Sequence, residues 1–112
     1  MSVVTRFAPS PTGDLHLGHI LAAKVARDLA RSSPDGIFLL RHEDIDGGRV
    51  KEECYHRIEE DLLWLGLGWD DNALRQSSRL DAYAEALQQI RDLELAYPCF
   101  CTRKELQTET ER

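Results

Sequence analysis

The sequence contains no apolar run long enough to cross a membrane, and its first residues lack the hydrophobic core of a signal peptide. We therefore expect a cytoplasmic protein with no membrane partner. Cysteine is scarce, and its odd count of three argues against a disulfide framework. Of the 112 residues, 42% are hydrophobic and 30% are charged, which fits one small globular domain.

Positive charge is also in short supply. The formal net charge is −6, with 20 acidic against 14 basic residues. Because nucleic-acid-binding proteins usually carry a basic surface, any contact with RNA is expected to be local or to lie outside this chain. Eleven of the basic residues are arginines, whose planar guanidinium group suits carboxylates and phosphates.

A strand, a loop rich in chain breakers and a helix follow one another at the start of the chain. Residues 3–8 are predicted to be extended, and Pro9, Pro11 and Gly13 break the chain after them. The charges at 24, 27, 28 and 31 form a single polar stripe on a helix over residues 20–31. Its other faces are expected to be mostly buried. These faces carry Ile20, Leu21, Val25 and Leu29.

The junction of this loop and helix is a candidate phosphate site. The first backbone N–H groups of a helix have no partner, and the helix dipole favours an anion there. His16 and His19 would add two side-chain donors, and Gly18 leaves room beside the backbone. A His-x-x-His pair alone is usually without function, but its place directly after a strand and a breaker-rich loop favours a site.

A second strand brings a charge cluster to the same place. Residues 32–36 form a turn, and the four apolar residues 37–40 predict a strand that is buried on both faces of a parallel sheet. Ligands of parallel sheets bind beyond the carboxyl ends of the strands. The charged residues 41–46 follow this strand, so we expect them at the same edge as the loop after the first strand.

The sequence after residue 49 predicts two more long helices and contains a pair of cysteines. A helix over 50–65 should bury Val50, Cys54, Ile58, Leu62 and Leu65, with Tyr55 and Trp64 packed beside them. Gly66 should cap it. Ser78 and Asp81 are expected to form a capping box at the start of a helix that runs to about Leu95 and buries an apolar stripe. That stripe is Leu80, Tyr83, Ala84, Leu87 and Ile90. Thr102 and Glu105 form a second capping box, which predicts another helix. Cys99 and Cys101 supply at best half of a zinc site, and their spacing alone indicates two ordinary thiols.

Two stretches resemble the glutamyl branch of the class I aminoacyl-tRNA synthetases. Residues 6–10 followed by His16-Leu17-Gly18-His19 are similar to the region of the "HIGH" motif, with Leu17 in the Ile position. Residues 40–46 are similar to a second motif, with His42 where Ile is usual. The resemblance covers residues 6–106 and implies an α/β fold: the N-terminal half of a Rossmann-like parallel sheet with flanking helices.

The resemblance implies the chemistry of the site. It implies ATP-dependent activation of glutamate to glutamyl-adenylate, then transfer to tRNA, with Mg²⁺ accompanying ATP. It places ATP against His16, Gly18 and His19, with both histidines catalytic. It implies that Glu43 binds the amino group of glutamate; Asp44 should face away from Glu43 on an extended segment, and Asp46 lies where the chain turns off. The glutamate and adenylate pocket would further involve Arg6, Phe7, Ala8, Pro9 and Ser10.

Within this branch the chain most resembles the short glutamyl-Q tRNA(Asp) synthetases, which implies tRNA(Asp) as partner, and we expect a monomer. In those proteins a cysteine pair like Cys99 and Cys101 binds zinc with a downstream Tyr and Cys. Residues 1–98 would then be the N-terminal part of the catalytic domain and residues 99–112 the start of a zinc-binding insertion. The motifs at Trp69-Asp70 and at 76–79 are expected to be structural.

Three alternatives stay open. An ordinary glutamyl-tRNA synthetase shares both motifs. The family's catalytic domain continues past this point to a "KMSKS" loop, so the 112 residues alone are expected to be inactive, and a non-catalytic nucleotide-binding remnant would look the same. A pantothenate synthetase-like ligase also carries His-x-Gly-His, but residues 41–46 speak against it.

Overall fold

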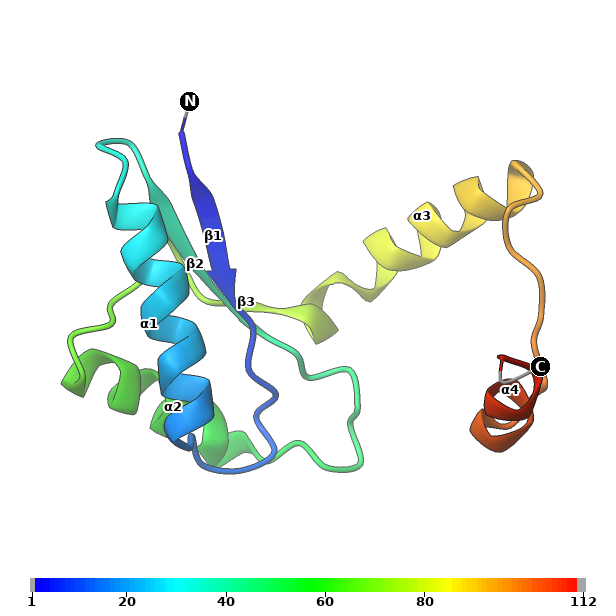
Figure 1. The fold of residues 1–112 in the computed structure, drawn as a ribbon, viewed down its shortest axis with the longest axis horizontal. Helices are drawn as coiled ribbons and strands as arrows, with labels where there is room; N and C mark the ends of the chain where they lie inside the picture. The colour runs from blue at the N-terminus through cyan, green and yellow to red at the C-terminus, as the bar shows by residue number, and fades with distance from the viewer. Residues whose placement is uncertain (1, 111–112) are drawn as a thin grey trace. The chain divides into compact units, whose positions relative to one another are not determined.

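The computed structural model describes residues 2–110 and divides the chain into two compact units, Met1–Leu80 and Asp81–Arg112. The first unit contains a three-stranded parallel sheet in the order β1-β2-β3 (Figure 1). Its elements are β1 (Val4–Phe7), α1 (Leu17–Arg31), β2 (Ile37–His42), α2 (Glu52–Trp64), β3 (Leu74–Arg75) and a 3-10 helix, η1 (Gln76–Arg79). The predicted α/β class with a parallel sheet and flanking helices is confirmed. No helix in the described part is long and apolar enough to cross a membrane.

The core of the first unit lies between the sheet and the two helices α1 and α2. The alternate residues Phe38 and Leu40 of β2 point into this core. Helix α1 contributes mainly Ala23 and Ala30, and helix α2 mainly Ile58 and Leu62. The expectation that β2 is buried on both faces is wrong for Ile37, which is exposed. The reason is that both helices contribute to one core on one face of the sheet, so only every second strand residue is covered.

Helix α1 differs from its prediction in two respects. It begins at Leu17 rather than at residue 20, because the side chain of His16 caps it. Its apolar faces are not mostly buried: Leu21, Val25 and Leu29 are exposed. The helix meets the sheet through a narrow strip of small residues, Ala23 and Ala30, which allows close approach but covers only one side.

Helix α2 follows its prediction more closely. Cys54, Ile58 and Leu62 are buried as expected, and so is Tyr55. Trp64 was expected to pack but is exposed, since it lies on the outer side of the last turn. Gly66 has a φ of 69°, the left-handed conformation that an αL cap requires. The helix runs from Glu52 to Trp64, so Val50 and Leu65 lie outside it, contrary to the prediction. Leu65 is also exposed.

The opening of β2 is fixed by Asp70, whose motif was predicted to be structural. The Asp70 carboxylate accepts two hydrogen bonds from the guanidinium of Arg31, at 2.9 Å each, and one from the backbone N–H of Phe38 at 2.8 Å. The Asp70 N–H in turn donates to the Phe38 carbonyl at 2.7 Å. Asp70 therefore ties the loop after α2 to both α1 and β2.

This cluster makes a pH-dependent prediction. The hydrogen bond from Arg31 and that from Phe38 hold the pKa of Asp70 below its usual value. A carboxyl group with a depressed pKa stabilises the fold above its unfolded pKa, about 3.9, and loses that contribution as the pH falls through its folded pKa. We expect Asp70→Asn to lower the thermal midpoint at neutral pH and to flatten its acid decline. Arg31→Gln should reproduce most of this effect; an unchanged acid profile in both variants would contradict the assignment.

The second unit contains α3, which begins at the boundary residue (Leu80–Asp92), and α4 (Arg103–Thr110). The predicted buried stripe on α3 is wrong, since no residue of this helix is buried in the described chain. The predicted cap by Ser78 is also wrong, because the Ser78 hydroxyl donates to the carbonyl of Arg75, the residue before η1. The capping box of α4 is confirmed: Thr102 N–H donates to the Glu105 carboxylate at 2.6 Å and Glu105 N–H to the Thr102 hydroxyl at 3.3 Å.

Candidate active site

The carboxyl ends of β1 and β2 share one edge, and backbone hydrogen bonds join the segments that follow them. The N–H of Glu43 donates to the Pro9 carbonyl at 2.9 Å, which extends the pairing of the two strands by one step. The N–H of Lys51 donates to the Pro11 carbonyl at 3.0 Å. Arg57 of α2 forms an ion pair with Asp14 of the loop at 2.9 Å. The breaker-rich loop is therefore held against the charged segment, as the order of elements predicted.

The two histidines form a reciprocal cap at the start of α1. Nδ1 of His16 accepts from the backbone N–H of Gly18 at 3.1 Å, and the N–H of His16 donates to Nδ1 of His19 at 3.3 Å. Their rings stack with centroids 3.7 Å apart. Because both Nδ1 atoms accept, each neutral imidazole carries its proton on Nε2. Burial, together with the charge of a protonated His16, lowers the pKa of His19 and favours this neutral form.

Gly18 is required by the cap itself. A Cβ at this position would lie 3.0 Å from Cε1 and 3.2 Å from Nδ1 of His16. Such contacts would press the imidazole away from the N–H that it caps. The glycine was predicted for the sake of a ligand's approach to the backbone, and the structure adds this second reason within the chain.

Glu43 is the carboxylate of the charged segment that pairs with Arg41. Its side chain is 40% exposed and accepts from Nη2 of Arg41 at 2.6 Å. His42 points to the opposite side, as predicted, where it is buried and contacts a Glu59 carboxylate oxygen through Nε2 at 2.9 Å. The partnership with Arg41 was missed, although residues two apart on a strand lie on the same face.

The two neighbouring carboxylates have other partners. Asp44 is 4% exposed and faces away from Glu43 as predicted. Burial acts to raise the pKa of Asp44, but hydrogen bonds from Ser77 and Tyr55 hold that pKa below its usual value. Asp46 is exposed and forms an ion pair with Arg49. Of the three acidic groups, Glu43 alone is placed beside the sheet face that carries Arg41.

A cavity of about 410 Å³ lies on that face, opposite the two helices. Three arginines contribute to it: Arg6 from β1, Arg41 from β2 and Arg79 from η1. Its other lining residues are Leu39, Leu40, Asp71, Asn72 and Leu74. Arg6 was predicted as a pocket residue, whereas residues 76–79, which include Arg79, were expected to be structural. Asp71, Asn72 and Leu74 were not predicted, because no local pattern shows that β3 joins β2. The cavity combines positive charge with an apolar floor, which suits a small anionic ligand.

The remaining predicted pocket residues differ in what they can offer. Phe7 is part of the hydrophobic core and Pro9 is buried, so their main chain rather than their side chains faces the edge. Ala8 is partly buried. Ser10 is exposed, and its carbonyl accepts from the N–H of Thr12 at 2.8 Å, which shapes the turn toward the histidines.

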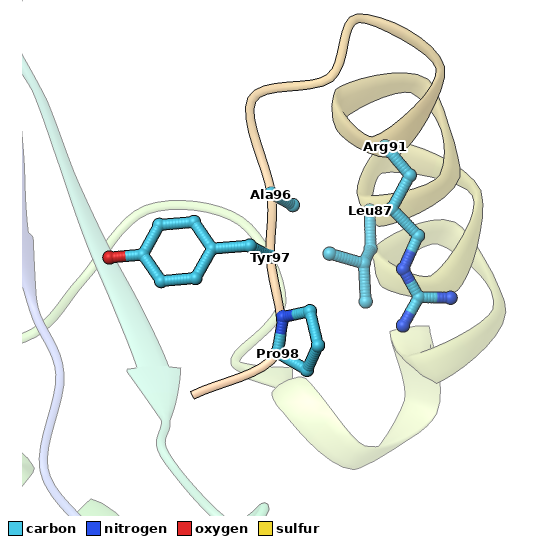
Figure 2. A pocket seen from close by; sticks show the side chains of 5 residues that line it. All are labelled: Leu87, Arg91, Ala96, Tyr97 and Pro98. Atoms are coloured by element: carbon cyan, nitrogen blue, oxygen red, sulfur yellow. The ribbon is translucent and has the colours of Figure 1, made fainter. Parts of the chain in front are cut away.

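The second unit holds the cysteine pair and a separate hollow. Cys99 and Cys101 are exposed free thiols, and no three His, Cys, Asp or Glu side chains come together anywhere in residues 2–110 to hold a metal. These two thiols alone supply half of the ligands of a four-ligand zinc site. A hollow of about 350 Å³ is lined by Leu87, Arg91, Ala96, Tyr97 and Pro98, with the Tyr97 ring turned away from α3 (Figure 2). It includes none of the predicted site residues.

Comparison with known proteins agrees with this geometry. A family model described as "tRNA synthetases class I (E and Q), catalytic domain" matches residues 2–112. The chain is 50% identical over 105 residues to a glutamyl-Q tRNA(Asp) synthetase of Rhodobacter capsulatus, covering 94% of this chain and 37% of that protein. It is 49% identical over 109 residues to a glutamate–tRNA ligase of Aquifex aeolicus, covering 97% of this chain and 23% of that protein.

A solved structure is similar over the same range. The crystal structure of a glutamate tRNA ligase from Elizabethkingia meningosepticum, in complex with its amino acid, superposes with a TM-score of 0.82 at 37% identity. It covers 96% of this chain and 23% of that one. The chain thus spans between about a quarter and two fifths of the length of these relatives. Taken with the histidine cap and the charged segment at one sheet edge, these matches show that the chain belongs to the class I tRNA synthetases of the E and Q type, within their catalytic domain.

Proposed function

We propose that the intact protein carrying this chain activates glutamate with ATP and transfers it to tRNA. One observation carries the proposal: Glu43 and the loop that ends in the His16–His19 cap are joined at one edge of a parallel sheet by the hydrogen bond from Glu43 N–H to the Pro9 carbonyl. Glu43 therefore lies at the same sheet edge as the loop that leads to the start of α1, where the helix dipole favours an anion. The relatives named above, a glutamyl-Q tRNA(Asp) synthetase and a glutamate–tRNA ligase, support the same substrates.

In the proposed reaction the α-carboxylate of glutamate attacks the α-phosphorus of ATP. A carboxylate oxygen–phosphorus bond forms, the bond from the α-phosphorus to its bridging oxygen breaks, and pyrophosphate leaves with that oxygen. The Nε2–H groups of His16 and His19 donate to phosphate oxygens, and the start of α1 adds its dipole. Mg²⁺ accompanying ATP would offset part of the phosphate charge. No protein nucleophile is needed, because the chain acts by positioning and by charge stabilisation.

The amino acid is proposed to lie between Glu43 and the arginine-lined cavity. The ammonium group needs an anion, and Glu43 is the partly exposed carboxylate that lies on the same side as Arg41. The side-chain carboxylate of glutamate needs a forked donor, which Arg6 offers within the cavity. Main-chain groups of residues 7–9, together with Ser10, complete this side of the pocket.

The nucleic-acid partner that we propose first is tRNA(Asp), by similarity to the Rhodobacter capsulatus protein. A second candidate is tRNA(Glu), because the Aquifex aeolicus relative is almost equally similar, at 49% against 50% identity. We further propose a monomer located in the cytoplasm, where free thiols such as Cys54 persist.

Exchange of labelled pyrophosphate into ATP, followed by tRNA charging, tests this function. The intact protein should exchange pyrophosphate in the presence of glutamate and then charge tRNA(Asp) in preference to tRNA(Glu). The 112-residue chain alone should show no exchange. Exchange driven by another acid substrate would support a different ligase, and no exchange in the intact protein would support a binding remnant.

A further prediction concerns zinc. We propose that Cys99 and Cys101 are two ligands of a site that other residues complete in the intact protein, because two thiols fill only half of a tetrahedron. The 112-residue chain as a monomer is therefore expected to bind zinc weakly if at all. Metal analysis after chelator treatment checks this, with Cys99→Ser/Cys101→Ser as the control. Stoichiometric, chelator-resistant zinc in the isolated chain would contradict it.

A further inference from the structure

Asp44 is a buried carboxylate whose acceptor sites are filled from two other elements. The hydroxyl of Tyr55 in α2 donates to Oδ2 at 2.8 Å, and the backbone N–H of Ser77 in η1 donates to Oδ1 at 2.8 Å. The Ser77 hydroxyl also donates to Oδ2. Asp44 is only 4% exposed. A carboxylate so enclosed has no room for a ligand, so its part in the site must be to hold other groups.

Asp44 connects two parts of the proposed site. It directly follows Glu43 in the chain. Its partner Ser77 belongs to η1, which ends with Arg79, one of the three arginines of the cavity. The Asp44–Ser77 hydrogen bonds therefore join the end of β2 to the wall that follows β3.

The anchoring partner Tyr55 is itself fixed. Its ring lies under the guanidinium of Arg75 in β3, with the carbon of that group 3.7 Å from the ring centroid, and it packs edge-on against the His42 ring at 5.0 Å. Arg75 also forms an ion pair with Glu52 at 3.2 Å. Asp44 is thus attached to a rigid part of the unit, not to a mobile side chain.

Glu43 takes its direction from the residues before and after it. The bond from its own N–H to the Pro9 carbonyl fixes the peptide before Glu43. The buried Asp44 carboxylate fixes the residue after it, and alternation along an extended segment then turns the Glu43 side chain to the opposite side. Without the second anchor, the peptide between Glu43 and Asp44 is free to rotate.

We propose that Asp44 is a positioning residue that sets the direction of Glu43 and the place of the Arg79 wall, and thereby the affinity of the site for glutamate. The inference rests on the proposed function. ATP, bound at the histidine cap, depends on neither Glu43 nor Arg79, so its affinity should be independent of Asp44.

Two variants of the intact protein test this inference against a general loss of stability. Asp44→Asn keeps the size of the side chain but loses its charge and one acceptor. Asp70→Asn is the matched control, because Asp70 also accepts three hydrogen bonds, from Arg31 and the Phe38 N–H, but at the opposite end of β2. KM values for glutamate and ATP are measured by pyrophosphate exchange on the folded fraction of each variant.

Asp44→Asn is expected to raise KM for glutamate roughly tenfold, because a displaced Glu43 carboxylate loses much of its charged hydrogen bond to the ammonium group, and to leave KM for ATP unchanged. Asp70→Asn should alter neither. Tyr55→Phe keeps the buried ring and removes one hydrogen bond, so it should raise KM for glutamate by less, and it decides the matter where Asp44→Asn does not fold.

The possible results distinguish a failure of the positioning role of Asp44 from a failure of the proposed function. Normal exchange by the parent protein with an unchanged KM for glutamate in the folded Asp44→Asn variant, or in Tyr55→Phe where Asp44→Asn fails to fold, would overturn the inference alone. An equal rise in Asp70→Asn would also overturn it, because the effect would then be one of stability. No glutamate-dependent exchange in the parent protein would overturn the proposed function and this inference with it.

Discussion

Replacing both His16 and His19 with alanine is expected to cost about 2–4 kcal/mol of transition-state stabilisation, or roughly 30- to 1,000-fold in the rate of adenylate formation. The physical reason is the loss of two Nε2–H donors at the start of α1. Their Nδ1 atoms are occupied by the cap, so Nε2 is the atom that each ring can offer to a phosphate. Pre-steady-state measurement of adenylate formation by the intact protein checks this.

The cap complicates this variant, and the sequence offers a control. Alanine removes the capping bonds as well as the donors, which costs about 0.5–2 kcal/mol of stability. His16→Ser with His19→Gln restores a Ser-x-x-Gln capping box but supplies no imidazole. The control variant should recover most of the thermal stability while remaining as slow as the double alanine variant. Recovery of the rate by this control would show that the histidines act only as a cap.

Glu43→Gln is expected to raise KM for glutamate by roughly 10- to 100-fold, since removing a charged hydrogen-bonding partner costs about 1.5–3 kcal/mol. KM for ATP should hardly change. Gln keeps an oxygen that accepts from Arg41, so the local geometry is preserved and the lost charge is what is measured. Pyrophosphate exchange at varied glutamate and ATP concentrations gives both constants.

Asp46→Asn is the matched control for Glu43→Gln. Asp46 is an exposed carboxylate three residues away that pairs with Arg49, so its replacement should leave both KM values near those of the parent. Loss of ATP affinity in Glu43→Gln with glutamate affinity retained would assign Glu43 to the wrong ligand. The proposed orientation of the pocket would then be wrong as well.

The meeting of the two strand ends at one edge of the sheet could be predicted because its signals are local. Pro9, Pro11 and Gly13 end the first strand, the apolar residues from Ile37 start the second, and parallel strands carry ligands at their carboxyl ends. Alternation along an extended segment also predicted that the Asp44 side chain faces away from Glu43, and the structure agrees.

The parts of the site that were missed depend on contacts between distant residues. The bond between Asp44 and Ser77 spans 33 residues, and β3 is only two residues long, too short for an alternation pattern. Apolar periodicity also overpredicted burial: Val25 in α1 and Leu87 in α3 are exposed. A periodic stripe shows which side of a helix is apolar, but it does not show whether another element covers that side.

The most direct test of the proposed site is a crystal structure of the intact protein with a non-hydrolysable glutamyl-adenylate analogue. We predict the ammonium group within hydrogen-bonding distance of the Glu43 carboxylate and the phosphate-mimicking group beside Nε2 of His16 and His19. We also predict the side-chain carboxylate at Arg6, in the arginine-lined cavity. An analogue bound elsewhere, or bound in reverse with its carboxylate end at the histidines and its ammonium group away from Glu43, would contradict it.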